Sequence, residues 1–304
     1  MKNDQTLLNQ KSLVDSFLSQ GPRPLASFSF INVFAWTDFF DFEFNVINGS
    51  LCIFAHHDSG CFLYLPPLGK RFDPSTIELA FKHMAPEGKL SAVNRIENIP
   101  GNLLSAFGPS SYNQYRKPAE YLYRKEELIA LQGNAYKSKR HDCNIFMTQV
   151  KDYSFETYKD ADFDGCMALF DVWAADRAKN NTNEIYRAML QENRLVHARL
   201  LRWWQPLGIV AKVLKTQGKI IGYTFGFPID ETTCCVYAEI ADLNIPGTAA
   251  YLFKSFCAES QLKDYSWINT MDDFAMPNVA RAKEAYHPAA LTPSYSVTIK
   301  KRTS

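Results

Sequence analysis

Three groups of polar residues in this sequence have the types and spacing to bind or transfer a charged group. The first is Lys139-Arg140, which lies beside Tyr136 and Asn144 on a predicted helix and ends a stretch rich in Lys and Arg that begins at Arg116. Arginine offers a planar fork that suits phosphate or carboxylate, and lysine offers a mobile point charge. The pair could therefore hold an anionic donor, although a solvated helix face explains the same charges.

The second group is a pair of carboxylates, Glu239 and Asp242, which follow a predicted strand and precede a predicted helix. A carboxylate at such a strand end could be the general base that deprotonates an attacking amine, if partial burial raises its pKa toward neutrality. Alternatively, these carboxylates cap the following helix or pair with Arg281. We take both as candidate catalytic residues.

The third group lies near the C-terminus and comprises Asn269, Asp273, Arg281, Lys283 and Tyr286. Arg281 and Lys283 are two positions apart on a predicted helix, so they do not share a face, and one of them is expected to serve as an ion-pair partner. Tyr286 could donate a proton to a leaving group. A tyrosine directly before His287-Pro288 can equally be a packing residue.

Other classes of site lack their sequence signals. There is no Gly-x-Ser-x-Gly elbow, P-loop or paired-glycine dinucleotide fingerprint. The seven cysteines form no Cys-x-x-Cys pair and no histidine lies at zinc-ligand spacing from them, so we expect no metal, and we place His56-His57 and His141 on the surface or in hairpins. The segment 244–247 has one glycine, and its Pro246 lacks a backbone donor, which disfavours coenzyme A; no cofactor is expected.

The overall composition is that of a folded chain with little net charge, and therefore without a strong electrostatic field. Hydrophobic residues make up 46% and aromatic residues 14% of the 304 residues, and the formal net charge is +1, so we expect no DNA partner. No apolar run approaches the roughly twenty residues of a membrane span. An odd number of cysteines and no apparent signal peptide predict a cytoplasmic protein with free thiols. Trp203-Trp204, after a basic helix, indicates either a buried pair or peripheral contact with a membrane or lipid.

Hydrophobic periodicity predicts the elements that carry these groups. In the first half, Asn48-Gly49 between alternating runs predicts a hairpin, and Asp58-Ser59-Gly60 a second one. The helices expected there lie within 7–18, from Asp73-Pro74 to Phe81, over 125–131 and over 136–148. We expect a short strand before the third of these helices, from Tyr121.

In the second half, two helices precede three consecutive strands, which are followed by helix, strand, helix and strand. The helices are expected over 166–178, 184–201, 248–261 and 278–286, and the strands over 209–214, 219–227, 233–240, 265–269 and 295–299. This is the element order of an N-acetyltransferase-like fold, and the first half could be a divergent copy of it. We therefore predict an α+β protein with two tandem domains, residues 1–150 and 151–304, each with a mixed, mostly antiparallel sheet and flanking helices.

Residues 133–146 match the pattern Gly-x-x-Tyr-x-x-Lys-Arg-x-x-x-Asn-x-Phe at every fixed position. Through this pattern the chain resembles uncharacterised relatives of the phosphatidylglycerol lysyltransferase catalytic domain. The segments 239–251 and 268–288 resemble two further motifs of that family. The resemblance implies tandem acetyltransferase-like domains related to enzymes that take amino acids from aminoacyl-tRNA.

The second-half motifs depart from the family pattern at several charged positions. Ile240 stands where relatives carry Lys, and Thr270 and Met271 stand where they carry Arg-Glu; Ala275 replaces Gly and Ala285 replaces Ser. A different substrate or a loss of activity would explain these changes. Three hypotheses follow: aminoacyl transfer from aminoacyl-tRNA or a similar activated donor to an amine or lipid hydroxyl, a coenzyme A-dependent N-acyltransferase, or a degenerate binding module. We further expect Lys139 and Arg140 to share one anion-binding cleft with Glu239, Asp242, Asn269 and Arg281.

Overall fold

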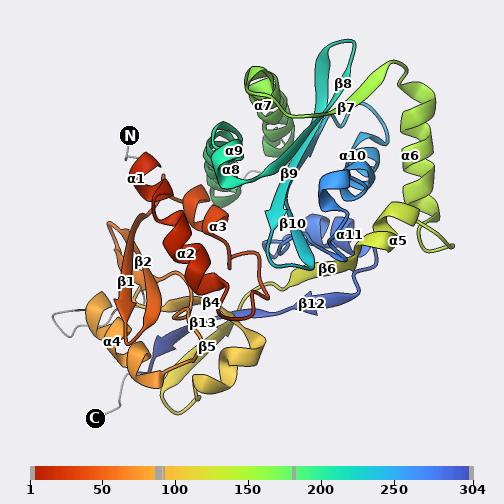
Figure 1. Ribbon diagram of the computed structural model, residues 1–304. Coiled ribbons are helices and arrows are strands. Elements are labelled where there is room, and N and C mark those ends of the chain that lie inside the picture. The colour runs from red at the N-terminus through yellow and green to blue at the C-terminus, as the bar shows by residue number, and fades with distance from the viewer. Residues whose placement is uncertain (1–3, 86–90, 92, 180–182, 301–304) are drawn as a thin grey trace. The chain divides into compact units, whose positions relative to one another are not determined.

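A computed structural model describes residues 4–85, 91, 93–179 and 183–300 (Figure 1). It divides into two compact units. The first holds the described residues up to Glu120 and those from Leu291 onward, and the second is Tyr121–Ala290. Each unit is built around one mixed β-sheet with helices packed on it.

The sheet of the first unit has six strands. Their order is β1 (Asp41–Ile47), β2 (Ser50–His57), β3 (Gly60–Leu63), β4 (Ile96–Pro100), β13 (Ser294–Ile299) and β5 (Tyr112–Arg116). Strands β3 and β4 are parallel, and the other neighbouring strands are antiparallel. Asn48 and Gly49 both have positive φ between the paired residues Ile47 and Ser50, so the predicted Asn-Gly hairpin is confirmed.

The helices of the first unit are α1 (Asp4–Leu8), α2 (Lys11–Leu18), α3 (Phe30–Ala35) and α4 (Pro74–Met84), with a 3-10 turn η1 (Gly101–Ala106). Helix α4 begins as predicted. The side chain of Asp73 accepts a hydrogen bond from the backbone N–H of Ser75, and Pro74 occupies the first turn, where its missing donor costs nothing. Ile77, Ala80 and Phe81 are among the residues that α4 buries.

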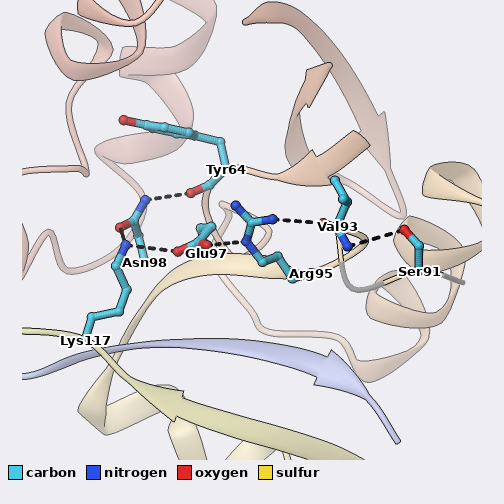
Figure 2. A network of polar contacts seen from close by, with 7 residues as sticks. All are labelled: Tyr64, Ser91, Val93, Arg95, Glu97, Asn98 and Lys117. Atoms are coloured by element: carbon cyan, nitrogen blue, oxygen red, sulfur yellow. Dashed lines mark hydrogen bonds and ion pairs between the residues drawn. The ribbon is translucent and has the colours of Figure 1, made fainter. Parts of the chain in front are cut away.

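A polar network links β4 to Tyr64, which follows β3, and to Lys117, which follows β5 (Figure 2). Glu97 bonds to Arg95 and, at 2.9 Å, to the Nζ of Lys117. Asn98, next along β4, accepts from the same Nζ at 2.9 Å and donates to the carbonyl oxygen of Tyr64, also at 2.9 Å. Burial raises the pKa of Glu97, but Lys117 and Arg95 more than offset that effect, so the net pKa lies below its usual value.

The second sheet has seven strands, most of whose residues belong to the second unit. Their order is β12 (Ala290–Thr292), β6 (Glu120–Arg124), β11 (Trp267–Asn269), β10 (Thr233–Ala241), β9 (Lys219–Pro228), β8 (Val210–Thr216) and β7 (Tyr153–Thr157). Strands β10 and β11 are parallel, whereas β7, β8, β9 and β10 form an antiparallel meander.

Helices cover both faces of this second sheet (Figure 1). On one face, His197 of α8 packs edge-on against Tyr223 and Phe225 of β9. On the other, Leu252 of α10 and Phe146 of α6 form a cluster with buried residues of β8 and β9. The helices are α5 (Lys125–Ala130), α6 (Lys137–Gln149), α7 (Phe163–Lys179), α8 (Glu184–Arg202), α9 (Trp204–Leu207), α10 (Thr248–Cys257) and α11 (Pro277–Glu284), with the 3-10 turns η2 (Asp160–Asp162) and η3 (Ser260–Leu262).

The two units repeat one succession of elements. A three-stranded meander, a helix and a strand parallel to the meander's last strand occur as β1-β2-β3-α4-β4 and again as β8-β9-β10-α10-β11. The next strand in each sheet comes from the other half of the sequence, since β13 lies beside β4 and β6 lies beside β11. The predicted α+β class, with two mixed and mostly antiparallel sheets and flanking helices, is confirmed.

This exchange of strands places the division between the units away from the predicted boundary. Residues 150 and 151 fall inside the second unit, because β7 extends the meander by pairing Tyr153 with Thr216 and Phe155 with Leu214. The strand predicted at 295–299 is present, but as β13 it pairs with β4 and β5 in the first sheet.

Candidate functional site

The parallel strands β10 and β11 separate partway along β10. They pair at Thr233 with Trp267, Cys234 with Ile268 and Cys235 with Asn269. Strand β10 then continues to Ala241, and within the described residues this last part pairs with β9 alone. Where two neighbouring strands separate, backbone groups on the facing edges lack a strand partner and can bind a ligand or a side chain.

A β-bulge lies just before this separated segment. The register between β10 and β9 shifts between Val236 and Ala238, which leaves Tyr237 as the extra residue. Gly226 is opposite the bulge, where a Cβ would approach the carbonyl oxygen of Cys235 to 2.0 Å. Our sequence reasoning missed Gly226, although a glycine inside a predicted strand is a signal for a bulge or a close backbone approach.

Glu239 follows the bulge and faces α10 and α6. It pairs with Thr224 of β9. Gly222 lies two residues before Thr224, on the same face of the sheet, and is next to Leu252 of α10. The Oε2 atom of Glu239 is buried and has no hydrogen-bond partner in the described part of the chain. Burial raises the pKa of this carboxyl to about 8, and the charge of Lys139 opposes the change. Such a group exchanges a proton near neutral pH.

Lys139 and Tyr286 meet beside Glu239. The Nζ atom of Lys139 lies 4.3 Å from the centroid of the Tyr286 ring, a cation–π distance. Phe253 of α10 contacts the same ring edge-on, with centroids 4.8 Å apart. Burial, followed by the charge of Glu239, raises the pKa of Tyr286, so its phenol stays protonated at neutral pH. Lys139, Glu239 and Tyr286, one candidate from each of the three groups, therefore lie close together.

Tyr136, at the start of α6, fixes the position of the backbone at Tyr286. Its hydroxyl donates to the backbone carbonyl of Tyr286 at 3.1 Å and lies 3.5 Å from Oε2 of Glu127. Its ring meets that of His287 edge-on, with a centroid distance of 5.2 Å. Tyr136 is buried, and its contacts position the segment that carries Tyr286.

Arg140, in contrast, does not join Lys139. Its guanidinium donates to the carbonyl oxygens of Leu131 and, at 2.6 Å, of Gly133. Leu131 has the left-handed conformation that ends α5, so Arg140 satisfies carbonyls at this helix end. Asn144 is exposed on α6. The expectation that Lys139 and Arg140 act as one anion-binding pair therefore differs from the structure, which directs them to different partners.

Asp242 also has a local structural contact. Its Oδ1 accepts hydrogen bonds of 3.0 Å from the backbone N–H and from the side-chain amide of Asn244, and its Oδ2 lies 3.9 Å from Nζ of Lys219. This turn links β10 to α10, but Asp242 does not cap that helix, because α10 begins after Gly247 and no side-chain hydrogen bond caps it. Glu239 is thus the carboxylate of the pair that has an unsatisfied oxygen.

The third group mostly shapes the loop after β11. Lys283 donates to the carbonyls of Thr270, Met271 and Asp272, the second at 3.1 Å. Asn269 and Asp273 also bond within this loop: Asn269 accepts from the N–H of Met271 at 2.7 Å, and Asp273 from that of Ala275 at 2.9 Å.

The backbone of this loop shows why the family motif has glycine at the position of Ala275. Met271, Phe274 and Ala275 have positive φ, which costs non-glycine residues free energy. A glycine would relieve that cost at position 275. Arg281 is exposed, and its Nε donates to the carbonyl of Pro277 at 3.3 Å.

The start of α10 is covered by the backbone of α6. A Cβ at Gly247, where φ is +82°, would lie 2.0 Å from the carbonyl oxygen of Asp142 and 3.0 Å from the backbone nitrogen of Phe146. The N–H groups at a helix start can bind a pyrophosphate only if it can approach them. Helix α6 occupies part of that approach.

A family model described as phosphatidylglycerol lysyltransferase, C-terminal, matches residues 22–298. The chain belongs to this family. Family membership covers both units and includes every candidate residue, so the resemblance seen in residues 133–146 is confirmed for the chain as a whole.

Solved structures show the same fold. A conserved protein of unknown function from Bacteroides thetaiotaomicron VPI-5482 is 23% identical, with a TM-score of 0.84 over 96% of this chain and 97% of that one. A C-terminal domain (DUF2156) from Agrobacterium fabrum is 12% identical, with a TM-score of 0.66 over 99% and 93%. L-PGS from Bacillus licheniformis is 15% identical, with a TM-score of 0.64 over 87% and 85%.

The comparison with curated proteins gave no match. In the part of the chain that the structure describes, no helix has the length and apolar character needed to cross a membrane. Trp204 packs edge-on against Tyr158, with ring centroids 5.7 Å apart, and its Nε1 donates to Asp160 at 3.1 Å. Trp203 and Trp204 are both half-buried, so they do not form the fully buried pair of the packing alternative.

Proposed function

We propose that this protein is an acyltransferase that moves an aminoacyl group from aminoacyl-tRNA, or from a similarly activated donor, to an amine or a lipid hydroxyl. The observation that carries the proposal is the buried carboxyl of Glu239, with its unpartnered Oε2 and a pKa near 8, where β10 separates from β11. The name of the family, which describes a lysyl transfer to phosphatidylglycerol, supports the choice of donor and acceptor class.

The reaction requires one proton to leave the nucleophile and one to reach the leaving group. The nucleophilic nitrogen or oxygen attacks the ester carbonyl carbon, a new bond to that carbon forms, and the ester C–O bond breaks. In the proposal, the ionised form of Glu239 accepts the nucleophile's proton. General bases work best when their pKa is near the operating pH, which is the range to which burial brings this carboxyl.

Tyr286 is the proposed proton donor to the departing oxygen. Its raised pKa keeps the phenol protonated, and the proton that Glu239 has gained can restore it after the step. Lys139, in contact with the Tyr286 ring, supplies a positive charge that favours the ionised form of Glu239 and attracts an anionic donor. The residues with backbone contacts, Arg140, Asp242, Asn269, Asp273 and Lys283, have positioning roles in this scheme, whereas the exposed Asn144 and Arg281 remain candidate substrate contacts.

The coenzyme A alternative receives less support. Acetyl-CoA enzymes of this fold place the pyrophosphate at the start of the helix that follows the meander, which corresponds to α10 here. Gly247 at that start is in close contact with the backbone of α6, and Pro246 provides no N–H.

We also propose a cytoplasmic location with peripheral access to lipid, because all seven cysteines are free and buried, which suits a reducing compartment.

The test is a transfer assay with labelled donors. Purified protein is incubated with labelled aminoacyl-tRNA or acetyl-CoA and with either phosphatidylglycerol vesicles or soluble amines. We expect label to pass from aminoacyl-tRNA, and Glu239→Gln to slow that transfer by roughly 10²- to 10⁴-fold, the usual contribution of a general base. Glu126→Gln, which changes an exposed carboxylate on α5, is the matched control and should retain the wild-type rate.

Each alternative gives its own result. Transfer from acetyl-CoA but from no aminoacyl-tRNA would favour the coenzyme A-dependent enzyme. A ligand that raises stability by about 2.7 kcal/mol at 100 times its dissociation constant, without any transfer, would favour the binding module. Transfer at an equal rate in wild type and Glu239→Gln would place the catalytic base elsewhere.

A further inference from the structure

The first unit contains a cluster of metal-ligating side chains that the proposed transfer reaction does not use. Glu43 of β1, His56 of β2 and His83 of α4 each direct a donor atom to one point, and these donor atoms all lie within 4.8 Å of one another. The Nε2 atoms of His56 and His83 are 2.8 Å and 3.1 Å from the same carboxylate oxygen, Oε2 of Glu43.

The fold creates this convergence from residues far apart in the sequence. Asp41 pairs with His56 and Glu43 pairs with Phe54, so Glu43 and His56 are diagonal neighbours on one face of the β1–β2 hairpin. The last turn of α4 crosses that face, and the ring of His83 packs on the ring of Phe54 with centroids 4.3 Å apart. Separations of 13 and 27 residues fit no short zinc motif, and the expectation of no metal considered only the cysteines and the histidines near them.

We propose that Glu43, His56 and His83 form a binding site for a divalent first-row transition ion, with zinc as the preferred occupant. Two imidazoles and one carboxylate are the donor set of many zinc sites with three protein ligands. A tetrahedral ion with bonds of about 2.0–2.2 Å sets its donors roughly 3.3–3.6 Å apart, which is within the 4.8 Å that separates the donor atoms here.

Neighbouring residues support this assignment. The amide of Asn45 donates to Oε1 of Glu43 at 2.6 Å, which fixes the carboxylate while Oε2 faces the imidazoles. The two imidazole donors favour zinc over magnesium or calcium, which prefer oxygen ligands.

The half-exposed position of the site leaves room for water to complete the coordination. The three side chains are 36% to 41% exposed, so an ion can enter from solvent and remain in contact with it. When bound, the ion would join the end of α4 to the β1–β2 hairpin. This role is independent of the acyl transfer proposed for the second unit.

The experiment measures zinc binding by the full chain, free of any histidine tag and stripped with a chelator. We expect one zinc ion per chain, not displaced by a large excess of magnesium. Glu43→Gln, His56→Ala and His83→Ala should each weaken zinc at least about 100-fold, since loss of an outer partner alone costs roughly 10- to 100-fold. Asn45→Ala tests such an outer partner and should fall in that lower range.

His57→Ala is the matched control. His57 is next to His56 but on the opposite face of β2, where it contacts Ser59, so its loss should leave zinc affinity unchanged. A histidine pair that merely hydrogen-bonds to Glu43 would bind no zinc, and that result would overturn the proposal. So would equal affinity in His56→Ala and His57→Ala. X-ray absorption of the zinc-loaded wild type tests the site without any variant: two imidazoles support it, and oxygen ligands alone contradict it.

Discussion

Replacement of Glu239 by glutamine should stabilise the protein, and by more at alkaline pH. Among the described residues, Oε2 of the wild-type carboxyl is buried without a hydrogen-bond partner, and the pKa of the carboxyl rises from the ordinary 4.5 to about 8. The folded state therefore binds a proton between pH 4.5 and 8 that the unfolded state releases. Stability must fall as pH rises through that window and then stay low, because the native state binds more protons. Glutamine has the same shape and no such titration.

The magnitude follows from the pKa change. At 1.36 kcal/mol for each pKa unit, the carboxyl costs the folded state up to about 5 kcal/mol when it is fully ionised. Most of that cost appears between pH 5 and 9, so the stability difference between Glu239→Gln and wild type should grow by about 4 kcal/mol across this range.

Urea unfolding at a series of pH values measures this difference. Glu126→Gln, at an exposed position on α5, should run parallel to wild type. A constant difference between Glu239→Gln and wild type from pH 5 to 9 would refute the reasoning, since it would mean that Glu239 ionises as readily in the folded state as in the unfolded chain. A destabilised Glu239→Gln would point to a carboxylate with a buried partner.

Three further predictions concern the surroundings of the site. Arg140→Ala should lower stability by about 1–3 kcal/mol, because it leaves carbonyls at the end of α5 without their charged donor, whereas Lys139→Ala should change stability little; equal effects in chemical unfolding would contradict this division of roles. Gly247→Ala should destabilise by about 2 kcal/mol or more, because its Cβ would meet Asp142 of α6, and an unchanged Tm would show that the two helices are not in such contact. Thiol titration should find seven reactive cysteines in denaturant and few in the native protein, since all seven are buried and free, while a denatured count of three or fewer would indicate disulfides.

Most elements of the fold were predictable because their signals are local. The Asn48-Gly49 turn, the capped start of α4 and the periodicity of α8 each depend on residues close together in sequence. Helix α3 was missed because all its residues are buried, which removes the polar face that reveals a helix. Strand β7 was not predicted, and the domain boundary was placed just before it, because polar residues flank it at both ends.

The exchange of β6 and β13 between the sheets could not be predicted from local patterns. A strand's own residues show that it is a strand, but its partner is set by tertiary packing. The same limit applied to the site. Residue types identified Glu239, Lys139 and Tyr286 as candidates, yet nothing in the sequence separates Lys139 from Arg140, whose different roles depend on where α5 ends.

The dependence of the transfer rate on pH tests the central claim most directly, namely that Glu239 is a general base whose pKa is set by burial and by Lys139. In wild type, kcat/KM should rise about tenfold per pH unit below neutrality and level off above about pH 8. Lys139→Ala removes the cation that favours the ionised carboxylate, so the same inflection should move to higher pH. A flat profile in wild type, or an inflection that stays in place in Lys139→Ala, would contradict the account.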